Sequence, residues 1–153
     1  MPKFNTHRQV KHTDLEMFNL VSDIECYPEF LPMCESLNIR SREERSDKTL
    51  LTADMTVGYK MIRETFTTQV LLNPAERRID VRYIDGPFRY LENRWIFKSL
   101  EDGKSCDVEF YIDYEFKSRM LGVLMGAMFD IAFKRFTEAF EARADKIYGL
   151  AQA

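Results

Sequence analysis

The chain has 153 residues, of which 45% are hydrophobic and 13% aromatic, enough apolar material for one domain with a substantial core. Its 22 basic and 25 acidic residues give a net charge of −3, so it lacks the cationic excess of DNA-binding proteins. Three cysteines without a C-x-x-C pair argue against a disulfide framework and for a reducing compartment.

The first thirty residues predict a strand and two short helices. Residues 3–11 alternate weakly between polar and apolar side chains, which indicates a strand. Residues 13–16, Thr-Asp-Leu-Glu, have the spacing of a capping box and predict a short helix. Pro28 and Pro32 interrupt the segment 23–32, which favours a second short helix and then a turn.

The middle of the chain predicts an antiparallel sheet. Period-two patterns separated by short turns indicate strands over residues 33–44, 49–57, 62–73, 78–85 and 90–100. The last strand, residues 106–117, alternates strictly between apolar and polar side chains. Such alternation is typical of a sheet that is covered on one face and wet on the other.

After Ser118 the hydrophobic period changes to 3.6, which predicts one long helix over residues 119–148. One stripe of this helix contains Leu121, Met125, Met128, Ala132, Phe136, Ala139 and Ile147, widened by Phe129, Phe133 and Phe140. The apolar face of the sheet is its obvious partner. We therefore predict an α+β fold in which a curved antiparallel sheet wraps the long C-terminal helix, as a single domain over residues 1–153.

A curved sheet and one helix need not close on each other completely, so the pattern predicts an apolar ligand cavity between them. The first half of the helix is rich in Gly, which is unfavourable there, and in Met, which adapts to apolar guests. The predicted ligand-binding residues are Met55, Tyr59, Leu91, Asn93, Trp95 and Phe97 on the sheet, and Leu121, Met125, Met128 and Phe129 on the helix. Ordinary core packing is the alternative, and composition alone favours it.

Few residues suggest chemistry. An inward Asn93 needs a hydrogen-bond partner; a ligand carbonyl is one candidate, and a water or backbone group is the commoner answer. Glu64 is in phase with apolar neighbours and could serve as an inward general base, although a carboxylate at a strand end more often reaches water. The chain has no motif for nucleophilic, phosphate-binding or metal chemistry. We therefore predict no catalytic residues, no metal and no catalytic cofactor.

The sequence also predicts where the protein resides. No basic-then-apolar signal pattern opens the chain. The longest apolar run, residues 120–129, is about half of a bilayer span. We expect a soluble cytoplasmic protein that can make transient contact with a membrane surface.

Three segments together resemble a known family. They are residues 27–34, Tyr-Pro-Glu-Phe-Leu-Pro-Met-Cys, with Ser36; residues 85–97, Asp-Gly-Pro-Phe-Arg-Tyr-Leu-Glu-Asn-Arg-Trp-Ile-Phe; and residues 114–118, Tyr-Glu-Phe-Lys-Ser, with the helix that follows. The family is the coenzyme Q-binding START-domain proteins of the polyketide cyclase/dehydrase-like superfamily, grouped with the ribosome association toxins. The family often has Trp where this chain has Met33.

The resemblance implies a helix-grip (START/Bet v-like) fold with an elongated cavity for ubiquinone or a related isoprenoid lipid. It implies binding without catalysis in support of respiratory electron transport, in a bacterium, peripheral to the inner membrane. The toxin relatives imply an alternative, a toxin of a toxin–antitoxin pair that binds a ribosomal subunit and blocks subunit association. The acidic balance disfavours direct RNA contact, but not contact with a ribosomal protein. A cyclase-type enzyme is a third alternative, disfavoured because no inward acid–base pair is evident.

Overall fold

The computed structural model describes residues 3–59 and 61–149, with the side chain of Tyr59 outside the described part. The elements in chain order are β1 (Lys3–Val10), α1 (Asp14–Ser22), the 3₁₀ helix η1 (Ile24–Glu29), β2 (Cys34–Arg45), β3 (Lys48–Tyr59), β4 (Ile62–Asn73), β5 (Arg78–Asp85), β6 (Phe88–Ser99), β7 (Cys106–Phe116) and α2 (Arg119–Tyr148).

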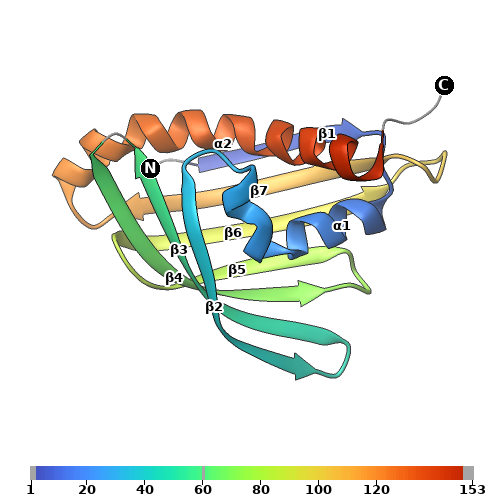
Figure 1. Ribbon diagram of the computed structural model, residues 1–153, viewed down its shortest axis with the longest axis horizontal. Helices are drawn as coiled ribbons and strands as arrows, with labels where there is room; N and C mark the ends of the chain where they lie inside the picture. Colours follow the sequence, from blue (N-terminus) through green and yellow to red (C-terminus); the bar gives the residue numbers. More distant parts are fainter. Residues whose placement is uncertain (1–2, 60, 150–153) are drawn as a thin grey trace.

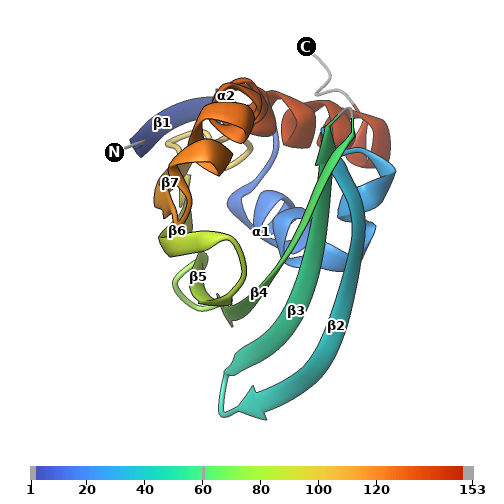
Figure 2. The same cartoon turned by 90° about the vertical axis from the view of Figure 1, so that its left-hand side faces the viewer.

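The described strands form one antiparallel sheet of seven strands in the order β1-β7-β6-β5-β4-β3-β2. The sheet curves strongly, and α2 runs along the β1–β7 side of its concave face (Figures 1 and 2). Helix α1 and η1 lie inside the same curve, between α2 and the strands (Figure 2). This arrangement confirms the predicted helix-grip fold.

The sheet's two faces follow the predicted alternation. In β7 every inward side chain from Cys106 to Phe116 is buried and every residue between them is half-buried. Strand β6 starts at Phe88, two residues earlier than the predicted 90, because Phe88 already pairs with Phe116 of β7, with a register shift before Tyr90. The Phe88 N–H also donates to the Tyr83 hydroxyl at 3.0 Å.

The long helix spans the predicted residues 119–148. Its buried stripe includes Thr137 and ends at Ala144. The prediction that Ile147 belongs to this stripe is wrong, because Ile147 is half exposed in the last turn of α2, where it is Tyr148 that contacts α1 by donating to the Glu16 carbonyl at 3.2 Å. No helix within the described residues combines the length and apolarity needed to cross a bilayer.

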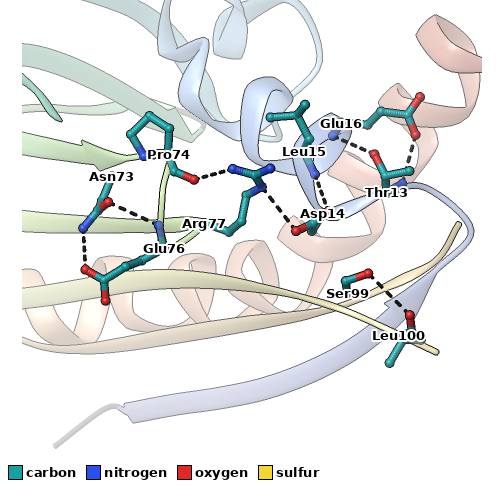
Figure 3. Close-up of polar contacts among 10 residues, drawn as sticks. All are labelled: Thr13, Asp14, Leu15, Glu16, Asn73, Pro74, Glu76, Arg77, Ser99 and Leu100. Atoms are coloured by element: carbon teal, nitrogen blue, oxygen red, sulfur yellow. Dashed lines mark hydrogen bonds and ion pairs between the residues drawn. The ribbon is translucent and has the colours of Figure 1, made fainter. Parts of the chain in front are cut away.

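Helix α1 is fixed at its first turn (Figure 3). The predicted capping box is present: the Glu16 N–H donates to the Thr13 hydroxyl at 3.0 Å, and the Thr13 N–H donates to the Glu16 carboxylate at 2.9 Å. Asp14 forms an ion pair with Arg77 at 3.2 Å, and Arg77 also donates to the Pro74 carbonyl in the β4–β5 turn. These contacts tie α1 to one end of the sheet.

We expect the stability of the protein to fall in acid partly through Asp54 on the outer face of the sheet. The Thr67 hydroxyl donates a hydrogen bond to the Asp54 carboxylate at 2.5 Å, and the Arg40 guanidinium donates another at 2.5 Å. The hydrogen bond from Thr67 is the main cause that holds the pKa of Asp54 below its usual range. Because the folded-state pKa is lowered, this stabilisation is present above the unfolded value of about 3.9 and is lost as the pH falls through the folded value.

Asp54→Asn should therefore lower the urea unfolding midpoint at pH 7 and lower it less at pH 3, where the unfolded carboxyl is mostly protonated. The matched control is Glu43→Gln, which removes an exposed carboxylate paired with Arg45 and should change neither midpoint measurably. An equal loss for Asp54→Asn at both pH values would show that the ionised carboxylate is not the stabilising group.

Candidate functional site

An apolar cavity lies between the second half of α2 and the concave face of the sheet. Its volume is about 100 Å³, and β2 to β7, α2, η1 and the segment after η1 contribute to its wall. Ligand pockets for drug-sized molecules usually measure about 300–1,000 Å³. In this conformation the cavity can hold a ring-sized group, and a longer ligand requires its walls to move apart.

Besides Trp95 with its indole N–H, three side chains bring polar atoms to this wall. The buried Tyr27 hydroxyl donates to the Val21 carbonyl at 2.5 Å, and burial raises the pKa of Tyr27. The Asn93 amide donates to the Tyr111 carbonyl at 2.8 Å, so the partner of Asn93 is a backbone group, the commoner of the expected answers. Thr68 is the third, on β4. The Asn93 amide oxygen and the Thr68 hydroxyl are thus the wall atoms best placed to meet a ligand's polar group.

The structure brings half of the predicted site residues to the cavity. Met55, Leu91, Asn93, Trp95 and Phe129 contribute to its wall. Their role in binding a ligand stays a prediction, as does that of Tyr59, whose side chain lies outside the described part.

The expectation that one continuous space also reaches the Met-rich half of α2 is not met. Met125 and Met128 are fully buried in the core without lining the cavity, and Leu121 is half-buried beside them. The cavity ends where the Phe88 and Phe129 rings meet, with centroids 5.8 Å apart, because these rings fill the space between helix and sheet.

Phe97 lies off the cavity in the other direction. Its ring packs edge-on against Phe18 of α1, with centroids 6.2 Å apart. Helix α1 therefore occupies the volume into which the predicted cavity would have continued.

Sequence reasoning missed most of the helical wall. Phe133, Phe136 and Phe140 join Phe129 there. The signal was present in the sequence, since phenylalanines spaced by four, three and four residues share one helix face.

The segment around η1 closes the side of the cavity between α2 and the β2 edge. The rings of Tyr27 and Phe30 pack edge-on against Phe140, with centroids 5.3 and 5.2 Å away. Arg143 lies 5.1 Å over the Phe30 ring and pairs with Glu29 at 3.0 Å. The first of the three resemblance segments is thus a cover held to α2 by aromatic and ionic contacts.

The described wall contains no carboxylate, imidazole, amine or thiol side chain. Glu64 is half-buried opposite Val57, beyond the cavity wall. Burial raises the pKa of Cys34 to about 11. Burial is also the main cause that raises the pKa of Cys106 to about 12. Both thiols are therefore protonated at neutral pH and act as buried apolar groups. The wall is suited to holding an apolar guest.

Comparison with known proteins agrees with this geometry. Residues 11–141 match the family described as "Polyketide cyclase / dehydrase and lipid transport". The ribosome association toxin RatA of Vibrio cholerae is 34% identical over 88% of this chain and 89% of its own. The mitochondrial coenzyme Q-binding protein COQ10 homolog B of Xenopus laevis is 30% identical over 88% of this chain and 54% of its own.

A solved structure shows the same fold along the whole chain. The 18 kDa protein CC1736 from Caulobacter crescentus matches with a TM-score of 0.80 and 32% identity, over 97% of this chain and 99% of that one. The fold, the apolar cavity and the family match over residues 11–141 lead to one conclusion. The chain belongs to the polyketide cyclase/dehydrase and lipid transport family.

Proposed function

We propose that the protein binds an isoprenoid quinone such as ubiquinone, or a related apolar lipid, in the cavity between the sheet and α2, without changing it chemically. The observation that carries the proposal is the wall itself, apolar apart from Tyr27, Thr68, Asn93 and the indole N–H of Trp95. A quinone ring is apolar on its faces and has carbonyls at its edge. Thr68 can donate to such a carbonyl, and the aromatic wall packs on the ring faces.

Two further observations support binding over catalysis. The described wall has no side chain that exchanges protons near neutral pH, which general acid–base chemistry requires. The COQ10 relative is named as a coenzyme Q-binding protein. The small volume implies that the isoprenoid tail enters only when the wall opens, and Met55 with its flexible side chain is one part of the wall that can adapt.

A second candidate is binding to a ribosomal subunit, which the RatA relative favours by its name and identity. In that case a surface of the protein would bind the ribosomal subunit, and the interior would serve only as the hydrophobic core. The cavity volume of about 100 Å³ is compatible with this alternative.

The deciding experiment is to purify the protein from its native host, extract it with organic solvent and identify bound lipid by mass spectrometry. We expect one isoprenoid quinone in near-stoichiometric amount. A second sample should be sedimented through a sucrose gradient with purified ribosomal subunits. Lipid no higher than in an unrelated protein carried through the same purification would refute the quinone proposal, and co-sedimentation with one subunit would then support the second candidate.

A further inference from the structure

Exposed apolar side chains gather at one end of the molecule. The β3–β4 turn, the β5–β6 turn and the start of α2 all lie at this end, which faces the viewer in Figure 2. We define the apolar end by five side chains on these elements: Met61, Ile84, Met120, Val123 and Leu124. Met61 is 98% exposed, Val123 75% and Met120 71%, so water covers them in the free protein.

Helix α2 differs along its length in a way that sets this end apart. From residue 120 to 129 it has no charged side chain, although its outer face is exposed there. After Asp130 the outer face has the ordinary charged residues of a helix in water, such as Lys134 and Glu138. A helical stretch that is apolar on both faces, with one face uncovered, indicates an interaction surface.

The charges that directly precede this stretch along the chain are positive. Lys117 and Arg119 are exposed, and neither forms an ion pair with any residue that the structure describes. The first turn of α2 contains no acidic residue, so both cations add to the positive N-terminal end of the helix. This arrangement is unfavourable for the helix alone and favourable beside phosphate groups. The acidic Asp85 is exposed at the end of β5 next to Ile84, so the positive charge of this end is concentrated at the start of α2.

Apolar side chains connect this surface to the cavity. A Cβ at Gly122 would lie 3.9 Å from the Phe116 ring, so the first turns of α2 rest directly on that ring. Phe116 stacks on Phe88 with centroids 4.9 Å apart, and Phe88 lines the cavity. The path from the outer surface to the cavity wall therefore crosses only apolar groups.

We infer that the apolar end docks on the surface of an anionic lipid bilayer. Met120, Val123 and Leu124 enter the boundary between headgroups and acyl chains, and Lys117 and Arg119 lie at the level of the lipid phosphates. A second copy of the chain fits less well, because a symmetric dimer through this face would bring the two Lys117–Arg119 pairs together. The inference goes beyond the proposed function and does not require a ligand in the cavity.

The test is flotation of the whole protein with vesicles of phosphatidylcholine alone and of three parts phosphatidylcholine to one part phosphatidylglycerol. We expect binding to the anionic vesicles that weakens with added salt, and weaker binding to the neutral ones. Val123→Glu combined with Leu124→Glu should reduce binding to anionic vesicles by about tenfold or more, because both side chains then stay in water. Lys117→Gln combined with Arg119→Gln should reduce only the salt-dependent part of the binding to anionic vesicles.

The matched control is Ile131→Glu combined with Ile147→Glu. These two residues are exposed apolar side chains on the same helix, outside the apolar end, so this variant should bind vesicles as the unaltered protein does. Circular dichroism and sedimentation velocity confirm that every variant folds and report its oligomeric state. The inference is wrong if the unaltered protein does not float with either vesicle, or if the Val123–Leu124 and Ile131–Ile147 variants lose binding equally. It is also wrong if the Val123–Leu124 change only converts a dimer to monomers.

Failure of this inference can be told apart from failure of the proposed function. Extracted lipid content reports the cavity, and flotation reports the apolar end. A protein that carries quinone but does not float disproves docking alone, whereas one that floats but carries no lipid disproves the quinone proposal alone.

Discussion

Trp95→Ala should cost about 3–5 kcal/mol of unfolding free energy, the usual range for removing a large aromatic side chain from a core. Trp95 is 4% exposed and lies at the centre of the cavity wall. Its ring contacts Phe110 at a centroid distance of 4.6 Å and Phe140 at 5.1 Å, and thereby joins the sheet to α2. The total free energy of unfolding of a small domain is only about 5–15 kcal/mol, so this variant should be close to the limit of folding.

The measurement is guanidinium unfolding followed by far-UV circular dichroism, because Trp95 is the protein's single tryptophan and fluorescence would be lost with it. Trp95→Phe keeps most of the ring contacts and should lose much less. Tyr90→Ala, on the half-buried outer face of the same strand, should cost less than about 1 kcal/mol. If Trp95→Ala costs no more than Tyr90→Ala, the ring does not join helix and sheet as described.

Ala53→Met should remove bound lipid almost completely, to about a tenth or less of the unaltered content. Ala53 is 2% exposed, sits on the inward face of β3 and lines the cavity. The longer side chain projects into a space of about 100 Å³ and occupies the place of a ligand ring. The fold should tolerate it, because the added atoms enter a cavity instead of a filled core.

Thr52→Met is the matched control, since it places the same side chain on the opposite face of the same strand. Lipid content by mass spectrometry and the thermal midpoint should be measured for both variants. Ala53→Met should be folded and lipid-free, and Thr52→Met folded and loaded. A folded Ala53→Met protein with unchanged lipid would show that the lipid binds outside this cavity.

The fold was predictable because local periodicity and turn residues agree along the chain. The alternation of β7 gave the last strand to within one residue, and the change of period after Ser118 gave α2 with its observed bounds. The start of β6 was not predictable, because it depends on the pairing of Phe88 with Phe116 across a register shift, a tertiary contact.

The cavity was predictable in kind but only partly in its residues. Periodicity shows which face a side chain is on, and this correctly placed Met55, Trp95 and Phe129 on the inner side. It does not show where along that face the elements touch. Met125 lies on the inward side of α2, yet the helix meets the sheet closely there and leaves no space. The place where the helix and the sheet meet depends on the curvature of the whole sheet, which no local pattern encodes.

The pairing of β1 with β7 has a consequence for how the chain reaches this fold. Lys3 lies opposite Asp113 and Val10 opposite Cys106, so the first strand to be synthesised has its partner in the last. While the ribosome is still making the middle of the chain, β1 has nothing to pair with. Contacts this far apart in sequence are slow to form because a long loop must close first. The β6–β7–β1 side of the sheet, together with α2, must therefore assemble late, after nearly the whole chain has been made.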